Sequence, residues 1–381
     1  VAKSEEAVFE WCVRWWEAGE RPEAELLAVM KHVRFAAMAA VFLRETVGAW
    51  PALHSMEAQR MLFNAVLPAV DGVKPVPRSG CGPRLIYVVG GVGEGNVRLS
   101  KVELYDPQNP SWKQLASMAG PRSGHGCAAL EGKLYAVGGN GGTGRGLDTA
   151  EVYDPQTDGW QPLANMTTVR SFFSLGAVGG KIYAIGGWGG WGGDSTLESV
   201  EAYDPQLGSW ALVASMSVQR IGHASVVLDG KIYSMGGLGD GTDGDSILKT
   251  VEVYDPQANS WLRVASMPQG RARHAVAAMG GKIYVTGGTR NGGENQGDTL
   301  NSACVYDPQA DAWTQLPSMS IARDSHASAA VGGKLYVFGG VNYSGTGYLG
   351  TVEVYDPASD SWVVQGPSLT CARIDIAAVA L

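Results

Sequence analysis

The sequence predicts a mostly β fold, in which six four-stranded blades form a propeller that is closed by a C-terminal strand. The main observation is an internal repeat: six times, an apolar run ends in two glycines and is followed by Tyr-Asp-Pro. A tryptophan comes seven residues after each of those tyrosines, and an arginine follows ten or eleven residues later. Six short-strand units with a period near fifty residues are typical of a propeller, which leaves few sheet edges exposed.

Each unit reads as four strands, with no segment long enough for a helix. In the third unit "KIYAIGG" is an apolar strand that ends in glycines, and "SVEAYD" alternates between apolar and polar residues. The Asp-Pro-Gln that follows supplies a turn with proline at its second position. The repeated residues are the glycine pairs that begin at Gly90, Gly138, Gly186, Gly236, Gly287 and Gly339, the tryptophans Trp112, Trp160, Trp210, Trp261, Trp313 and Trp362, and the arginines Arg122, Arg170, Arg220, Arg271, Arg323 and Arg373.

The register of the repeats predicts how the ring closes. The first unit begins directly with the strand "RLIYVVGG" and lacks the strand that opens every later unit. The chain ends with "ARIDIAAVAL", which is such an opening strand without a unit behind it. We therefore expect the C-terminal strand to complete the first blade, so that removing residues 373–381 costs far more than the loss of a frayed terminus.

The N-terminal segment has a different character. Residues 1–70 contain about four short helical patterns, the first with Ser4 as a plausible N-cap, and residues 71–84 read as a linker. A small helical domain is thus expected before the propeller, which occupies residues 85–381.

Composition narrows the classes of partner. The net charge of −8 and the pI near 5.3 argue against nucleic acid or an anionic membrane surface. No apolar run approaches the roughly 20 residues that a membrane-spanning helix needs. The five cysteines form no C-x-x-C motif, so neither a zinc site nor a redox motif is indicated, and a reduced, cytoplasmic setting is expected.

Residues that the repeats do not require point to a binding surface. Two tryptophans, two tyrosines and a phenylalanine fall outside the repeated positions, in loops after a glycine pair or after the repeated arginine: Trp188, Trp191, Tyr343, Tyr348 and Phe172. Because strands in a blade run up and down, these two sets of loops emerge on one face. The tryptophans lie in "GGWGGWGGDS", whose G-x-G-x-x-G spacing is not a dinucleotide site, since a strand and not a helix follows. The alternative, that both tryptophans cover their own blade, remains open.

No catalytic or metal centre is indicated. All four propeller histidines occupy one repeated position, three residues after the arginine: His125, His223, His274 and His326. The acidic loop with Asp240 and Asp243 lacks the terminal Glu of a calcium loop. A glutamate two residues before each repeated tyrosine, replaced once by Cys304, is expected to pair with the repeated arginine or with backbone. We expect no cofactor, no metal and no enzymatic activity.

The glycine pairs, Tyr-Asp and spaced tryptophans resemble the kelch repeat, over residues 85–381. "ELLAVMKHVRF" and "VFLRETV" in the N-terminal segment are similar to the C-terminal half of a BACK domain. Together they resemble the back part of the BTB-BACK-kelch family, whose members are substrate adaptors of cullin-RING ubiquitin ligases. The resemblance implies a non-catalytic protein-recognition module, whose cullin would be bound only through BTB and BACK segments that this chain does not show. An actin-binding or cytoskeletal kelch scaffold is the alternative, and a metal-dependent kelch enzyme is a less favoured one.

In that family the partner binds the loops between the second and third strands (b–c loops) and the turns that lead into the next blade (d–a turns). Carried over, Phe172, Trp188 and Trp191 are expected as apolar anchors, and Arg273 and Arg290 as partners of carboxylates. Asp240 and Asp243 are expected to meet a basic residue. The full set of candidate residues is Ser123, Asn140, Ser171, Phe172, Trp188, Trp191, Asp240, Asp243, Arg273, Arg290, Asp324, Ser325, Tyr343, Tyr348 and Asp375.

Overall fold

The computed structural model describes residues 85–142, 146–190, 196–239, 246–290, 299–345 and 347–381. The helical domain predicted for residues 1–70 and the linker predicted for residues 71–84 lie outside these ranges and stay predictions. Within the described residues, no helix is long and apolar enough to cross a membrane.

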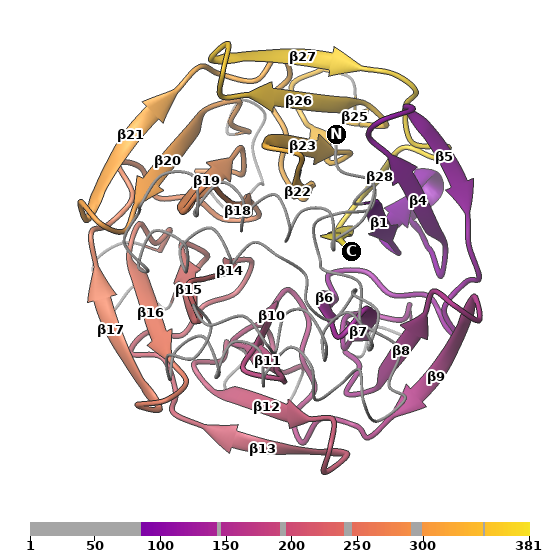
Figure 1. Cartoon of the computed structure of the whole chain (residues 1–381), viewed down its shortest axis with the longest axis vertical. Coiled ribbons are helices and arrows are strands. Elements are labelled where there is room, and N and C mark those ends of the chain that lie inside the picture. Colours follow the sequence, from indigo (N-terminus) through magenta and orange to yellow (C-terminus); the bar gives the residue numbers. More distant parts are fainter. Residues whose placement is uncertain (1–84, 143–145, 191–195, 240–245, 291–298, 346) are drawn as a thin grey trace, which may run out of the picture. The chain divides into compact units, whose positions relative to one another are not determined.

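Six four-stranded antiparallel sheets surround a common centre, with β5, β9, β13, β17, β21 and β27 on the outside (Figure 1). The predicted fold class, a six-bladed propeller with four-stranded blades, is confirmed. The blades, each from its innermost strand outward, are: first, β29 (Ala377–Ala380), β1 (Ile86–Val89), β4 (Val102–Asp106), β5 (Ser111–Gln114); second, β6 (Gly126–Leu130), β7 (Lys133–Val137), β8 (Ala150–Asp154), β9 (Gly159–Leu163); third, β10 (Ser174–Val178), β11 (Lys181–Ile185), β12 (Val200–Asp204), β13 (Ser209–Val213); fourth, β14 (Ala224–Leu228), β15 (Lys231–Met235), β16 (Val251–Asp255), β17 (Ser260–Val264); fifth, β18 (Ala275–Met279), β19 (Lys282–Thr286), β20 (Ala303–Asp307), β21 (Ala312–Leu316); sixth, β22 (Ala327–Val331), β23 (Lys334–Phe338), β26 (Val352–Asp356), β27 (Ser361–Gln365).

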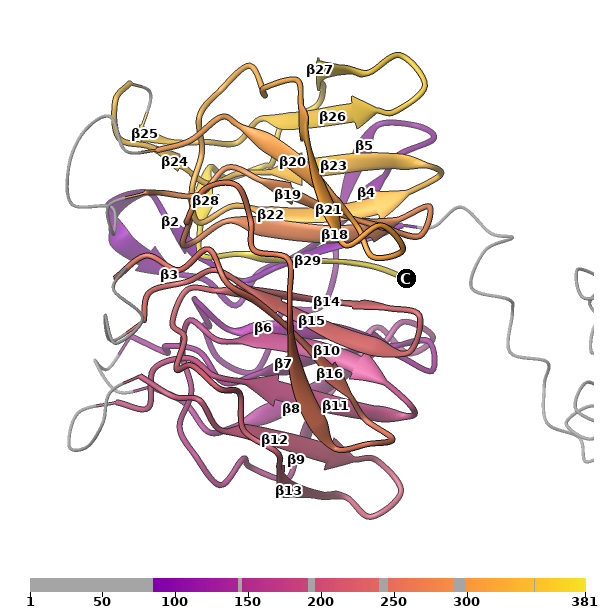
Figure 2. The same cartoon turned by 90° about the vertical axis from the view of Figure 1, so that its left-hand side faces the viewer.

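Short elements decorate one side of the disc. They are β2 (Val92–Gly93), the 3-10 helix η4 (Glu94–Asn96), β3 (Val97–Arg98), β24 (Val341–Asn342), β25 (Gly347–Tyr348) and β28 (Arg373–Ile374). Figure 2 shows β2, β3, β24, β25 and β28 on one side, and the C-terminus on the opposite side. The b–c loops and d–a turns of the described residues therefore share a face, as predicted.

The last strand closes the ring in the predicted register. β29 pairs antiparallel with β1, from Ile86 opposite Ala380 to Val89 opposite Ala377. Leu85 and Leu381 exchange two further backbone hydrogen bonds, at 3.2 and 3.1 Å. β29 also contacts β6 and β22, so the innermost strands form an uninterrupted circle.

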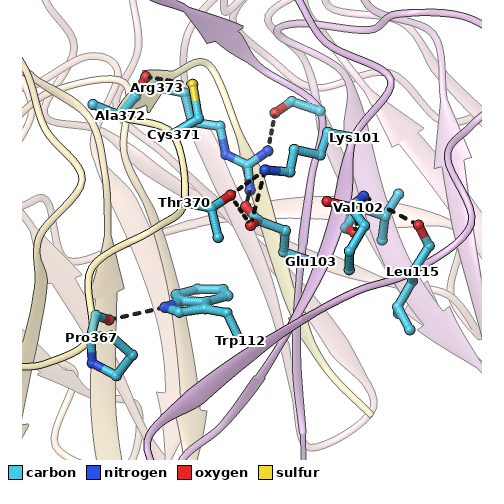
Figure 3. Close-up of polar contacts among 12 residues, drawn as sticks. Lys101, Val102, Glu103, Trp112, Leu115, Pro367, Thr370, Cys371, Ala372 and Arg373 are labelled. Carbon is cyan, nitrogen blue, oxygen red and sulfur yellow. Dashed lines mark hydrogen bonds and ion pairs between the residues drawn. The ribbon is translucent and has the colours of Figure 1, made fainter.

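Five of the six blades each contain a glutamate that forms a buried ion pair with a repeated arginine. The repeated arginine binds the repeated glutamate, as expected, and its Nη1 donates to the carbonyl of the first glycine of a pair. The pairs, by nitrogen–oxygen distance, are Arg122–Glu151 (2.9 Å), Arg170–Glu201 (3.0 Å), Arg220–Glu252 (2.9 Å), Arg323–Glu353 (2.6 Å) and Arg373–Glu103 (2.5 Å). The last pair joins the C-terminal segment to the first blade, where Lys101 and Thr370 also contact Glu103 (Figure 3).

The fifth blade departs from this framework at two positions. Cys304 stands where the other blades have glutamate, and Arg271, although 2% exposed, has no carboxylate partner and an unbonded Nε. The glutamates of the fourth and sixth blades also accept a backbone N–H, from Ser217 and Ser320. In the fifth blade that position is Pro268, which has no N–H to donate.

The repeated tryptophans join neighbouring blades. Each indole Nε1–H donates to a carbonyl of the preceding blade's last segment, as from Trp160 to Ala116 at 2.9 Å and from Trp112 to Pro367 at 2.9 Å (Figure 3). The ring of Trp160 also packs 5.2 Å from Tyr153, centroid to centroid. These contacts explain why the tryptophans recur, and they leave Trp188 outside the framework.

Candidate functional site

Six backbone hydrogen bonds form a closed ring where the d–a turns meet. The participating residues, here called the axial belt, are Gly124, Phe172, Gly222, Arg273, Ser325 and Asp375. Each N–H donates to the carbonyl of the preceding member, over distances from 2.6 Å (Arg273 to Gly222) to 3.1 Å (Gly124 to Asp375). The bond from Gly124 to Asp375 closes the circle through the C-terminal segment.

All six belt residues have a left-handed backbone, with φ between 50° (Phe172) and 62° (Gly222). Glycine adopts this conformation freely, whereas other residues lose roughly 1–2 kcal/mol. Phe172, Arg273, Ser325 and Asp375 nevertheless carry side chains there. Strain of this kind clusters at functional sites, so the belt is the first candidate for one.

The belt surrounds a small polar cavity on the propeller axis. Its volume is about 110 Å³, and the six belt residues and the residue after each of them line it. Four of those following residues are the repeated histidines. Burial and Arg122 lower the pKa of His125 to about 3, and burial and Arg220 do the same for His223, so both are neutral at pH 7.

The histidines have a structural role between blades. A Cβ on Gly90 would lie 2.8 Å from Cε1 of His125, and one on Gly236 would lie 2.7 Å from Cε1 of His274. Each ring therefore packs against the first glycine of a pair, which explains why both residues recur. Among the described residues, no three His, Cys, Asp or Glu side chains are placed to hold a metal ion.

Charged side chains gather on one side of the cavity. Arg273, Ser325 and Asp375 line it, and Asp324 lies next to them within electrostatic range of Arg273 and Asp375. Asp324 is fully buried, and within the described residues neither carboxylate oxygen has a hydrogen bond of good geometry, although the Ser325 side chain is near enough to stabilise its charge. Burial, opposed by Arg273, raises the pKa of Asp324 to about 6. Burial also raises the pKa of Asp375, against the opposing charge of Arg273.

Tyr343 belongs to the same group. It is 38% exposed, in the turn between β24 and β25, and burial together with the charge of Asp324 raises the pKa of its hydroxyl. The structure thus brings together five residues that the sequence predicted separately: Arg273, Asp324, Ser325, Tyr343 and Asp375. We call them the axial charge cluster.

Two of the three predicted aromatic anchors, Phe172 and Trp188, lie on the same face. Phe172 is a belt residue whose ring covers Gly124, where a Cβ would lie 2.9 Å from Cδ1 of Phe172. Trp188 is partly buried, and its backbone exchanges two hydrogen bonds with Ser171, at 2.7 and 3.0 Å. Trp191, Asp240 and Asp243 lie outside the described residues, so their roles stay predictions.

The other candidates differ in exposure. Ser123 and Ser171 are buried like Asp324, and each of the three forms an isolated β-bridge with a b–c residue. Arg290 is exposed, and Asn140 and Tyr348 are partly exposed. A partner on this face would therefore meet the exposed residues first. Sequence reasoning missed the axial belt, and the signal that could have indicated its left-handed backbone is the pair of glycines, Gly124 and Gly222, at one repeat position.

The fold and the repeated residues define a propeller of kelch repeats, and comparison with known proteins gives the family. The chain belongs to the KLHDC2/KLHL20/DRC7 Kelch-repeats domain family, which it matches over residues 52–237 and 222–372. The BACK resemblance of the N-terminal segment stays a prediction.

Individual relatives match over shorter stretches. Kelch-like protein 25 of Xenopus tropicalis is 38% identical over 112 residues, which are 29% of this chain and 18% of the relative. Alpha-scruin of Limulus polyphemus is 33% identical over 112 residues, 29% of this chain and 12% of the relative. The matched stretch is thus less than a fifth of either relative's length. The solved structure of YjhT aligns with a TM-score of 0.61 at 18% identity, covering 75% of this chain and 96% of that one, which supports the fold.

Proposed function

We propose that this propeller is a non-catalytic protein-recognition module, and that its partner binds the face formed by the axial belt and the b–c loops. The observation that carries the proposal is the belt: four residues keep side chains in a left-handed backbone where glycine would be less strained. Beside them Asp324 is buried without a hydrogen bond of good geometry, which is costly for the fold alone. Left-handed non-glycine residues also occur in hairpin turns of the blades, as at Asp158 and Asp311. What favours a binding site is that the belt residues form one ring around the axial cavity, beside a buried carboxylate.

The finer proposal is that the intact protein is a substrate adaptor of a cullin-RING ubiquitin ligase in the cytoplasm. The Kelch-like relatives and the BACK resemblance of the N-terminal segment support it. The module would act by positioning, because it raises the local concentration of a target beside the ligase. The alternative is a cytoskeletal scaffold, which the match to alpha-scruin favours.

Capture from native lysate tests the recognition face. The full chain is compared with Trp188→Ala on the face and with Leu262→Ala as a control, since Leu262 is 66% exposed on the outer strand β17. A hot-spot aromatic contributes about 2 kcal/mol or more, so Trp188→Ala should weaken capture of a true partner roughly 30-fold. Equal loss in both variants, or loss in neither, contradicts the proposed face.

Two binding assays separate the ligase adaptor from the scaffold. Co-purification of a cullin with the full-length natural protein supports the adaptor, and co-sedimentation with actin filaments supports the scaffold. An adaptor is refuted if the protein binds filaments and recovers no cullin.

A further inference from the structure

The axial charge cluster has an excess of hydrogen-bond acceptors. Asp324 and Asp375 share one cation, Arg273, and one hydroxyl donor, Ser325, and within the described residues neither oxygen of Asp324 has a hydrogen bond of good geometry. Arg98 of β3 also acts on Asp375, but it does not line the cavity. The neutral histidines and Tyr343 add no charge. A ligand group that enters here must therefore donate hydrogen bonds, and a third carboxylate would be repelled.

The cavity is the right size for a head group and too small for a whole ligand. Its volume of about 110 Å³ equals roughly three to four water molecules, whereas sites for drug-sized molecules start near 300 Å³. A positively charged donor gives the strongest hydrogen bonds to a carboxylate. The guanidinium of arginine and the ammonium of lysine both satisfy these requirements.

We propose that the axial cavity receives one basic side chain of the partner, which Asp375 contacts directly and Asp324 stabilises from behind. The location rests on the proposed recognition face, and the charge of the ligand is the new element. In this arrangement Arg273 is the resident counter-ion, which the incoming cation displaces from the two carboxylates. Its partly exposed position on the rim allows its long side chain to turn toward solvent.

Binding should depend on pH in a defined direction. With a pKa of about 6, Asp324 is ionised above pH 6 and attracts a cation, while below pH 6 it is protonated. The affinity for a basic group should therefore be constant above about pH 7 and fall by up to tenfold per pH unit below pH 6. Burial also raises the pKa of Asp375, so its protonation adds to this dependence. The share of Asp324 is the difference between the pH profiles of the wild type and of Asp324→Asn, and identical profiles would contradict its role.

The test uses the full chain and a small probe, N-acetyl-arginine N-methylamide, with the neutral citrulline analogue as the matched control. Backbone amide signals of Gly124 and Gly222 report binding, since both N–H groups belong to the belt. We expect the arginine probe to saturate with a dissociation constant of about 1 mM, and the citrulline analogue to bind at least tenfold more weakly. Equal shifts with both probes, or none with either, overturn the inference, while lysate capture tests the recognition face separately.

Two variants should change the affinity for the arginine probe in opposite directions. Asp375→Asn keeps the shape and tolerates a left-handed backbone, and should weaken the arginine probe at least tenfold. Arg273→Gln removes the resident cation and should strengthen the probe several-fold. The reverse pattern would show that the cavity takes an acidic group. Should either variant fail to fold, the comparison of the arginine probe with its citrulline analogue on the wild-type chain decides alone.

Discussion

Restoring the missing carboxylate of the fifth blade tests how the buried ion pairs act. The variants are Cys304→Glu, Pro268→Ser and the two combined. The positions correspond, because Cys304 pairs across the sheet with Val285 as Glu353 pairs with Val337 in the sixth blade. The single change to glutamate gives Arg271 its charge partner but buries a carboxylate that lacks the N–H which Ser217 and Ser320 supply in the fourth and sixth blades.

The expected change in stability follows from the hydrogen bonds of the glutamates in the fourth and sixth blades. There the glutamate Oε2 accepts a backbone N–H at 2.8 Å from Ser217 and at 2.7 Å from Ser320, in addition to the arginine. A hydrogen bond to a charged group contributes about 1.5–3 kcal/mol. Since desolvation of the new carboxylate offsets its attraction to Arg271, the change to glutamate alone should alter stability little. The double variant should exceed the sum of the singles by about 2 kcal/mol.

Urea unfolding, followed by tryptophan fluorescence, measures the unfolding free energies of the wild type and the three variants. The coupling energy is the stability change in the double variant minus the sum of the changes in the two single variants. Equal slopes of the unfolding free energy against urea show that the comparison is valid. Independent sites add within about 0.5 kcal/mol. A coupling energy below that value would refute the idea that carboxylate, guanidinium and N–H act as one unit.

Three further outcomes are expected. Removing residues 373–381 deletes the strand that pairs with β1 and should abolish cooperative melting in circular dichroism; a sharp transition in the truncated chain would contradict ring closure. Gly120→Val should raise the unfolding free energy by about 1 kcal/mol. A Cβ at Gly120 meets nothing within 4 Å and faces a cavity of about 510 Å³, and the equivalent position two repeats later is the buried Val218. Unchanged or lower stability in urea would contradict this expectation. Asp324→Asn should raise the unfolding free energy at pH 7.5 by up to about 3 kcal/mol. The pKa of Asp324 is about 6 in the folded protein and about 4 in the unfolded chain, so the wild type loses stability as the pH rises from 4 to 6, whereas asparagine does not titrate. Identical pH profiles of stability in the two proteins would contradict this expectation.

The sequence was sufficient for the propeller because its repeats mark every blade with the same residues. Even the closure by residues 373–381 could be predicted, since the first and last units lack complementary strands. The burial of Ser123 and Ser171 could not be predicted, because it depends on packing between loops that the repeat pattern does not describe. The axial belt was equally out of reach, because it is a ring of backbone contacts between turns that lie about fifty residues apart.

The clustering of Arg273, Asp324 and Asp375 illustrates the same limit. Each residue follows a repeated arginine, so the repeat alone placed all three on one face. Their mutual distances, and the absence of a hydrogen bond of good geometry to the carboxylate of Asp324, depend on how the last turn meets the fifth and sixth blades. A sequence pattern describes one blade at a time and does not contain that information.

The position of Asp375 on the C-terminal segment has a further consequence. Asp375 reaches the belt only when β29 has joined β1, whereas Arg273 and Ser325 belong to earlier turns. A partner that holds these residues together holds the C-terminal segment against the turns that open the fifth and sixth blades. Partner binding and closure of the ring by β29 are then thermodynamically linked, so a bound partner stabilises the closed ring. Conversely, a C-terminal segment that detaches from β1 releases the partner before any blade unfolds.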